Sequence, residues 1–143
     1  MKNKIINIAC LGAGKHALKN TIPAIKSLGN FKLVAIYKRN IKKNLKFFNE
    51  LECLILDDLD KIFKIKDLNA VYISSPPSLH YSMAKKALFH NKHVIIEKPS
   101  TTTLIQAKNL CTTARKKKLI LMEGLMYKYH DQFIKLLKYT KKT

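Results

Sequence analysis

The sequence predicts an α/β fold in which helices cover a doubly wound parallel sheet. Short apolar runs alternate with helical patterns along all 143 residues, the order of elements that builds a parallel sheet. A glycine-rich segment, residues 12–14, follows the first apolar run directly. Two later strands end in loops with proline and polar residues, and ligands of open α/β sheets bind beyond the carboxyl ends of strands. We therefore expect one domain with a ligand site at one rim of its sheet.

The first part of the chain predicts a strand, a helix and a second strand. Residues 5–11 form a short apolar run, as in a buried strand. Apolar residues then recur at helical spacing, at Leu18, Ile22, Ile25 and Leu28. Pro23 lies inside this pattern and removes a backbone hydrogen bond, so we expect a kink or a late helix start. Gly29-Asn30 ends the helix, and the β-branched and aromatic residues of 31–37 predict the second strand.

The middle of the chain predicts two short helices and two strands. Asn40 is expected to cap a lysine-rich helix that runs through Asn49. Residues 52–56 form a short third strand, and Asp57-Asp58 caps the next helix. The apolar side of that helix carries Leu59, Ile62 and Phe63. Residues 70–74 form the fourth strand.

The second half continues the alternation. A helix begins at Ser78, and its apolar face is expected to carry Leu79, Met83, Ala87 and Leu88. Residues 93–96 are almost entirely apolar, as is usual inside a parallel sheet. Thr103 begins another helix, on which Leu104, Ala107, Cys111 and Ala114 are aligned. Its cationic last turn, residues 115–118, suits the negative end of the helix dipole. Residues 119–122 predict the last strand, and 132–139 a further helix.

The composition argues against several classes of protein. The formal net charge is +19, but Arg39 and Arg115 are the only arginines, a lysine bias that fits an AT-rich genome as well as a binding face. The lysines are spread along the chain without a basic strand interleaved with aromatics, which argues against nucleic acid as a partner. No apolar run is long enough to span a membrane. Cys10, Cys53 and Cys111 lack the spacing of metal ligands. We expect buried or half-buried thiols, no metal site and a cytoplasmic location.

The glycine segment has the context that a dinucleotide-binding fingerprint requires. It follows an apolar strand and opens a helix, with Gly12 allowing a tight turn and Gly14 close approach of a pyrophosphate. Ala17 permits close packing of the helix on the strand. The helix start supplies free N–H groups and partial positive charge. The residues expected at the phosphates are Gly12, Ala13, Gly14, Lys15 and His16. The alternative is a glycine turn without a ligand.

The end of the second strand predicts the type of cofactor. NAD enzymes place an acid about 20 residues past the fingerprint, where it binds the ribose hydroxyls. Here Lys38 and Arg39 follow Tyr37, with no acid. Two adjacent cations suit a 2′-phosphate. We therefore expect NADP, with NAD as the alternative.

With these residues in place, the sequence resembles the Gfo/Idh/MocA oxidoreductases. The matching segments are Gly12-Ala13-Gly14, residues 75–80 (Ser-Pro-Pro-Ser-Leu-His), Ala87-Leu88 and residues 92–99 (Lys-His-Val-Ile-Ile-Glu-Lys-Pro). Glu-Lys-Pro after an apolar strand is the most specific of them. Residues 123–130 resemble the Glu-x-x-Met-Tyr-Arg-x-His-Pro segment of the branch that includes dihydrodiol dehydrogenases and nucleotide-sugar 3-ketoreductases. Lys128 and Asp131 depart from that segment.

The resemblance implies roles for the matched residues. Lys98 is implied as the catalytic residue, near the nicotinamide and the reacting oxygen, where an ammonium stabilises developing negative charge. Lys98–Pro99 is a candidate cis peptide bond. The implied cofactor contacts of this half are Ser75, Pro76, Pro77, His80, Glu97, Lys98 and Pro99. Tyr127 and Tyr129 are implied on the substrate side, and packing is the alternative role for both.

Members of this family continue into a second, α+β domain that these 143 residues lack. We therefore expect an NAD(P)-binding Rossmann domain over 1–125, with 126–143 starting the connection to a missing C-terminal substrate domain. The expected function is hydride transfer to or from a sugar or nucleotide-sugar by a truncated enzyme. Its isolated chain would bind cofactor weakly, catalyse poorly and form a homo-oligomer only if the second domain is supplied. The alternatives are a non-catalytic dinucleotide-binding module and a basic nucleic-acid-binding protein.

Overall fold

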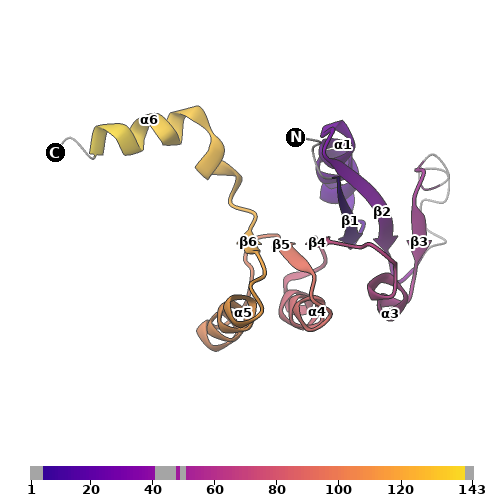
Figure 1. Ribbon diagram of the computed structural model, residues 1–143. Coiled ribbons are helices and arrows are strands. Elements are labelled where there is room, and N and C mark those ends of the chain that lie inside the picture. Colours follow the sequence, from indigo (N-terminus) through magenta and orange to yellow (C-terminus); the bar gives the residue numbers. More distant parts are fainter. Residues whose placement is uncertain (1–4, 41–47, 49–50, 141–143) are drawn as a thin grey trace.

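One six-stranded parallel sheet organises the chain (Figure 1). The computed structural model describes residues 5–40, 48 and 51–140. The strands are β1 (Ile6–Leu11), β2 (Phe31–Tyr37), β3 (Leu54–Leu56), β4 (Ala70–Ile73), β5 (His93–Ile96) and β6 (Leu121–Glu123). They lie in the order β3-β2-β1-β4-β5-β6. The order reverses between β1 and β4, which is the Rossmann arrangement and confirms the predicted doubly wound sheet.

Helices cover both faces of the sheet. Figure 1 shows α3, α4 and α5 on one face and α1 on the other. Their bounds are α1 (Ile22–Ser27), α3 (Leu59–Phe63), α4 (Pro77–Phe89) and α5 (Leu104–Lys116). A short 3-10 helix, η2 (Met126–Tyr129), leads into α6 (Asp131–Thr140), which extends away from the sheet. The helix predicted over 132–139 is thus confirmed, one residue longer at each end.

The helix after the glycine segment changes its geometry just before the proline. Its first turn begins at Lys15, a π-helical turn η1 (Ala17–Thr21) follows, and α1 continues from Ile22. Pro23 stands near the start of α1, directly after this π-helical turn, and has no N–H to donate to the preceding turn. The predicted irregularity at Pro23 is therefore present as a π-turn, the form in which helices absorb such a break.

The predicted cap at Asp58 is confirmed, and the helix predicted to begin at Thr103 also starts with a side-chain cap. The Asp58 carboxylate accepts the Asp60 N–H of α3 at 2.8 Å, and the Thr103 hydroxyl accepts the Gln106 N–H of α5 at 3.3 Å. Helix α4 begins at Pro77 rather than at the predicted Ser78. Proline is favoured at the first position of a helix because its N–H is not needed there.

Three element predictions are wrong in detail. Strand β3 begins at Leu54, not at residue 52, and β6 begins at Leu121, not at residue 119. Leu119 instead closes α5, since its N–H donates to the Ala114 carbonyl after Lys118 turns with φ 55°. On α5, Leu110 and Ala114 are buried, whereas Leu104 and Cys111 are exposed. The helix predicted over 40–49 falls largely outside the described residues.

The core lies in two layers, one on each face of the sheet. Successive side chains of a strand point to opposite faces, so Ala9 and Leu11 of β1 join the cluster under α3, α4 and α5. Ile8 and Cys10 join the cluster under α1. In register, Leu11 pairs with Ile73, Ile73 with Ile96, and Ile96 with Glu123. The loops after β1, β4, β5 and β6 therefore start side by side at one rim.

Candidate functional site

The glycine turn after β1 packs tightly against the end of β4. Gly12 has φ 114°, and a Cβ there would lie 2.7 Å from the Ser75 nitrogen. The Gly12 carbonyl accepts a hydrogen bond from the Ser74 hydroxyl at 2.8 Å, and its N–H donates to the Tyr37 carbonyl at 3.0 Å. Both the backbone angle and the packing therefore require glycine at this position.

The next glycine faces open space. A Cβ at Gly14 would meet nothing within 4 Å, and its carbonyl accepts the Leu18 N–H at 3.0 Å as the helix begins. Ala17 is buried against the sheet, as expected for close helix packing. Lys15 and His16 are exposed in the first turn, where N–H groups have no partner inside the helix. The turn is thus an open cradle whose shape fits a pyrophosphate.

His80 joins the loops that follow β4 and β5. Its side chain is buried, and its ring nitrogens lie 2.8 Å from the carbonyl oxygens of Ser75 and Pro99. Carbonyl oxygens only accept, so both contacts are hydrogen bonds when each ring nitrogen carries a proton. His80 therefore fixes the two loops relative to each other. Its contact with a cofactor stays a prediction.

The Ser75 hydroxyl is a buried group that lacks a partner within the described part of the chain. A buried hydroxyl without a hydrogen bond is costly and calls for a ligand or a water. It lies beside the glycine turn, at the switch point of the sheet. Together with the space above Gly14, it fits the binding of a dinucleotide along this rim.

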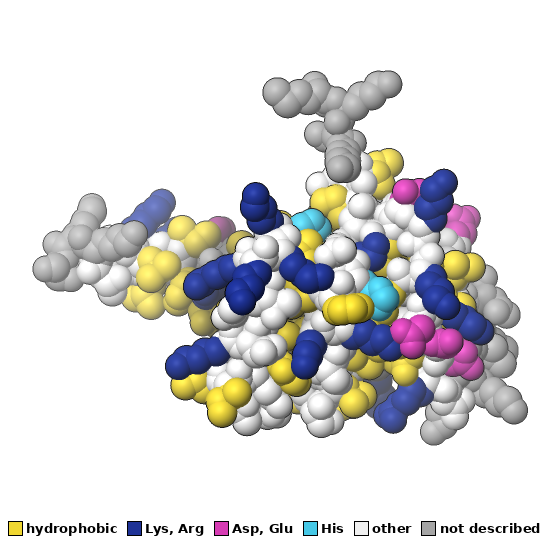
Figure 2. Space-filling view, turned by 60° about the horizontal axis from the view of Figure 1, so that its bottom comes forward, with side chains coloured by type: hydrophobic (Ala, Val, Ile, Leu, Met, Phe, Trp, Pro, Cys, Tyr) yellow, Lys and Arg dark blue, Asp and Glu magenta, His cyan; other side chains and the backbone are white. Residues whose placement is uncertain are grey.

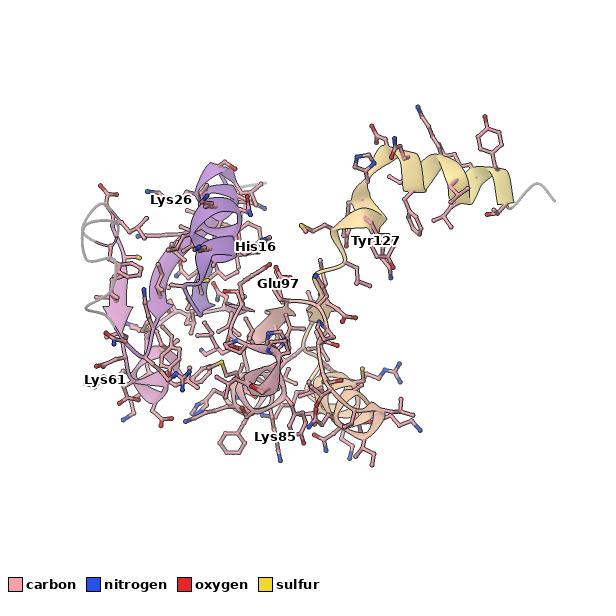
Figure 3. The ribbon with its side chains drawn as sticks, turned by 180° about the vertical axis from the view of Figure 1, so that it is seen from behind. His16, Lys26, Lys61, Lys85, Glu97 and Tyr127 are labelled. Atoms are coloured by element: carbon pink, nitrogen blue, oxygen red, sulfur yellow. The ribbon has the colours of Figure 1, made fainter. Side chains whose placement is uncertain are left out.

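The Glu97 carboxylate, at the end of β5, connects three parts of the site. One oxygen accepts a hydrogen bond from the Tyr72 hydroxyl and lies 3.3 Å from His16 Nε2. The other accepts the Lys98 N–H at 3.3 Å. Burial, followed by the hydrogen bond to Glu97, raises the pKa of Tyr72 above its ordinary value, so the phenol stays neutral. Figure 3 shows His16 and Glu97 close together, one on the first helix and one on the sheet.

The Lys98 side chain is exposed at the rim, next to this carboxylate. The predicted cis bond between Lys98 and Pro99 is present. The loop after it is held by Glu123 of β6, whose carboxylate accepts the Ser100 N–H at 2.7 Å. The structure therefore brings the Glu97-Lys98-Pro99 segment to the same rim as the glycine turn.

The two cations after β2 have different surroundings. The Lys38 ammonium lies over the Phe48 ring, 4.7 Å from its centroid. The Lys38 backbone N–H donates to the Leu56 carbonyl at 2.9 Å. Arg39 is exposed at the rim. No acid occupies the end of β2, so the structure keeps positive charge where a ribose 2′-substituent would lie.

The two tyrosines predicted on the substrate side lie on η2, away from these contacts. Tyr127 packs edge-on against Phe133 at 5.0 Å between ring centroids. The Tyr129 hydroxyl lies 3.9 Å from the Met122 sulfur. Both side chains are more than half exposed, and Figure 3 shows Tyr127 beyond the sheet, on the side of α6. Their role at a substrate stays a prediction.

Sequence reasoning missed two residues that position the site. Tyr72 was predicted only as part of a strand, and Glu123 only as part of a motif. A hydroxyl-bearing residue near the end of an otherwise apolar strand is the signal that could have found Tyr72. Glu123 gave no comparable signal, because its partner is a backbone N–H 23 residues away.

The described residues provide little support for other kinds of site, such as a metal centre or a reactive cysteine. Residues 5–40, 48 and 51–140 contain no group of three His, Cys, Asp or Glu side chains that could hold a metal ion. Burial raises the pKa of the Cys10 thiol to about 12, so it is inert. Cys111 is exposed, contrary to the expectation of buried or half-buried thiols. Among the helices described, none is both long and apolar enough to cross a membrane.

Comparison with protein families places these features in context. The Gfo/Idh/MocA model, described as an oxidoreductase family with an NAD-binding Rossmann fold, matches residues 6–125. A dTDP-3,4-didehydro-2,6-dideoxy-alpha-D-glucose 3-reductase of Saccharopolyspora spinosa is 32% identical over 129 residues, which are 90% of this chain and 39% of that protein. The uncharacterized oxidoreductase YgjR of Escherichia coli is 31% identical over 121 residues, 84% of this chain and 37% of its own length.

Solved structures show the same arrangement. The 3-ketoreductase KijD10 of Actinomadura kijaniata, in complex with NADP and TDP-benzene, superimposes with a TM-score of 0.89 at 27% identity. The match covers 97% of this chain and 43% of that one. The present chain thus spans about two fifths of the length of the curated relatives it matches.

Proposed function

The chain belongs to the Gfo/Idh/MocA oxidoreductase family, and from this we propose that it is the NADP-binding part of an enzyme acting on a sugar or nucleotide-sugar. The reaction is hydride transfer between the cofactor and a hydroxyl or ketone carbon. The observation that carries the proposal is the meeting of the Gly12–Gly14 cradle with Lys98 at one rim. A domain that only bound a dinucleotide would not need an ammonium there.

Different residues of the rim have different roles in the proposed reaction. The chemistry that a nicotinamide would supply when bound at this rim is hydride transfer. The open backbone at Gly14 and the first helical turn bind the pyrophosphate, and the Ser75 hydroxyl gains a partner. Lys98 donates a hydrogen bond to the substrate oxygen, stabilises its negative charge as the hydride arrives, and gives it a proton. In the reverse direction Lys98 takes that proton back.

The preference for NADP rests on the end of β2. Arg39 is exposed there beside Lys38, and no acid is present to bind ribose hydroxyls. KijD10, which is similar to this chain, was solved with NADP. Because Lys38 lies over the Phe48 ring, we assign the main contact with the 2′-phosphate to Arg39, whose guanidinium forms paired hydrogen bonds to phosphate.

Calorimetric titration of the chain with NADPH and NADH tests the proposal. We expect NADPH to bind about tenfold or more tightly, a difference of about 1.4 kcal/mol or more. Arg39→Ala should remove most of that difference while leaving NADH binding unchanged. The matched control is Arg115→Ala, at the far end of α5, which should change neither affinity. Tighter binding of NADH by the unmodified chain would contradict the cofactor assignment, and binding of neither would contradict the function.

A further inference from the structure

The layer formed by α4, β5 and α5 is almost free of acidic residues. Between Asp67 and Glu123 the sequence contains nine lysines and arginines and a single acid, Glu97. Glu97 lies at the rim, and its side chain is only 13% exposed. Figure 2 shows this face of the molecule, with dark blue cations spread over it and the acids gathered to one side. This surface therefore carries positive charge that almost no acid offsets.

An open groove on this surface combines cations with aromatic rings. It runs along α4 and the adjoining part of α5, and Tyr81, Lys85, Phe89 and Lys117 line it. Phe89 is 73% exposed. The Lys117 ammonium lies 5.5 Å from the Phe89 ring centroid, and the Lys85 ammonium lies 5.8 Å from that of Tyr81. Cations and rings thus alternate along the groove.

The positive charge of the lysines that line the groove is only partly neutralised by acids. Lys86 is paired with Asp60 at 2.7 Å. Lys117 donates to the neutral oxygens of Phe89 and Asn91, each at 2.8 Å. Lys85 and Lys117 form no ion pair with an acid within the described part of the chain. Their field is therefore directed toward solvent and attracts anions.

The spacing of the Tyr81 and Phe89 rings is compatible with a polymer whose planar groups stack on them. The exposed Phe89 and the half-buried Tyr81 are eight residues apart on α4, about 12 Å at 1.5 Å per residue. His90 stacks on Phe63 with the rings parallel and their centroids 4.9 Å apart. It also contacts the Phe89 ring at nearly a right angle. Exposed aromatic faces between cations are the means by which proteins bind single-stranded nucleic acid without reading its sequence. An acidic peptide would use the lysines but not the ring faces.

We propose that the α4–α5 groove binds single-stranded nucleic acid, with bases stacked on Phe89 and Tyr81 and phosphates on Lys85 and Lys117. The sequence alone argues against nucleic acid as a partner, because no single strand alternates basic and aromatic residues. In the folded chain, residues of two helices, α4 and α5, together produce such an alternation. The groove lies on the opposite side of the sheet from His16 (Figure 3), and Phe89 and Lys117 lie at the edge opposite the cofactor rim.

Fluorescence anisotropy with a labelled oligonucleotide of about 16 nucleotides tests this, at salt concentrations from about 50 to 200 mM. Phe89→Ala should weaken binding about 5- to 150-fold at every salt concentration. Replacing both Lys85 and Lys117 by glutamine should instead reduce the slope of log affinity against log salt by about 1.4. Glutamine keeps an amide donor at position 117, and circular dichroism verifies the fold of each variant.

The matched controls remove the same kinds of side chain, one aromatic ring or two lysine charges, from other surfaces. Tyr139→Ala removes an exposed ring from α6, and glutamine at Lys19 and Lys26 removes two exposed charges beside α1; both controls should bind as the unmodified chain does. Equal effects of Phe89→Ala and Tyr139→Ala would overturn the proposal. So would displacement of the oligonucleotide by NADPH, or equally tight binding of polyglutamate or phosphatidylglycerol vesicles. Because NADPH binding is measured separately, failure here leaves the proposed cofactor function intact.

Discussion

At the scale of single residues, two glycines of the same turn have different tasks. Gly12 is enclosed by the backbone of Ser74 and Ser75 and has a φ that disfavours any side chain. Gly14 is surrounded by open space. The first is therefore required by the fold, and the second is required only if a ligand occupies that space.

Alanine substitution separates these tasks. Gly12→Ala should lower the free energy of unfolding by about 2–5 kcal/mol, because the Cβ meets backbone and the angle is strained. Gly14→Ala should leave stability within about 0.5 kcal/mol and weaken NADPH binding about tenfold or more, since its Cβ enters the pyrophosphate cradle. Urea unfolding and calorimetry measure the two quantities.

The control is Gly29→Ala, where a Cβ would meet nothing within 4 Å. It should leave both stability and binding close to those of the unmodified chain. If Gly14→Ala bound NADPH as well as Gly29→Ala does, the open space above Gly14 would not be the site of the phosphates.

At the scale of elements, the site depends on two loops that one buried side chain joins. His80 lies on α4, and its ring contacts the loop after β4 and the loop after β5. The position of Lys98 next to Pro99 thus depends on a residue 18 positions earlier in the chain. This explains how the rim keeps its shape although the loops after β4 and β5 lack regular secondary structure.

His80→Ala should therefore affect stability and binding together. Loss of the buried ring and of its contacts with the Ser75 and Pro99 carbonyls should lower the free energy of unfolding by about 2–4 kcal/mol. The affinity for NADPH should fall about tenfold, because the loops no longer hold one arrangement. His130→Ala, an exposed histidine before α6, is the control and should change neither. Unchanged NADPH affinity in folded His80→Ala would show that the loops keep their positions without this link.

The sequence predicts elements better than it predicts the contacts between them. Periodicity located the strands and helices to within about two residues, because burial on a sheet imposes it. It misplaced the apolar face of α5, since Leu104 and Leu110 both fit a helical repeat and only packing against the core cluster selects Leu110. The roles of Tyr72 and His80 depend on partners 25 and 19 residues away. Such contacts follow from the order of the strands, which local pattern does not contain.

At the scale of the whole molecule, the segment after β6 leaves most of its side chains exposed. α6 has no buried residue, and Tyr127 and Tyr129 are largely exposed beside it. The relatives have more than twice the length of this chain. We propose that the groups that bind the sugar come from the part of those relatives that this chain does not match.

A fusion tests this division of the enzyme and the role of Lys98 together. The chain is joined to the unmatched remainder of the Saccharopolyspora spinosa reductase, and oxidation of NADPH is followed with a TDP-linked keto-sugar. We expect turnover by the fusion, because Lys98 and the substrate then share one site. Lys98→Ala should lower kcat about 100- to 10,000-fold, as expected when a proton donor at the reacting oxygen is lost.

Two measurements make the result decisive. Lys108→Ala removes an exposed lysine of α5 and should leave kcat unchanged, which excludes a general effect of charge. Calorimetry verifies that the fusion and its Lys98→Ala variant still bind NADPH. Turnover that survives Lys98→Ala would assign proton transfer to another group. A fusion that binds NADPH but does not oxidise it with the keto-sugar would contradict the proposed hydride transfer, because the cofactor rim and the relative's own substrate-binding part would then both be present without producing the reaction.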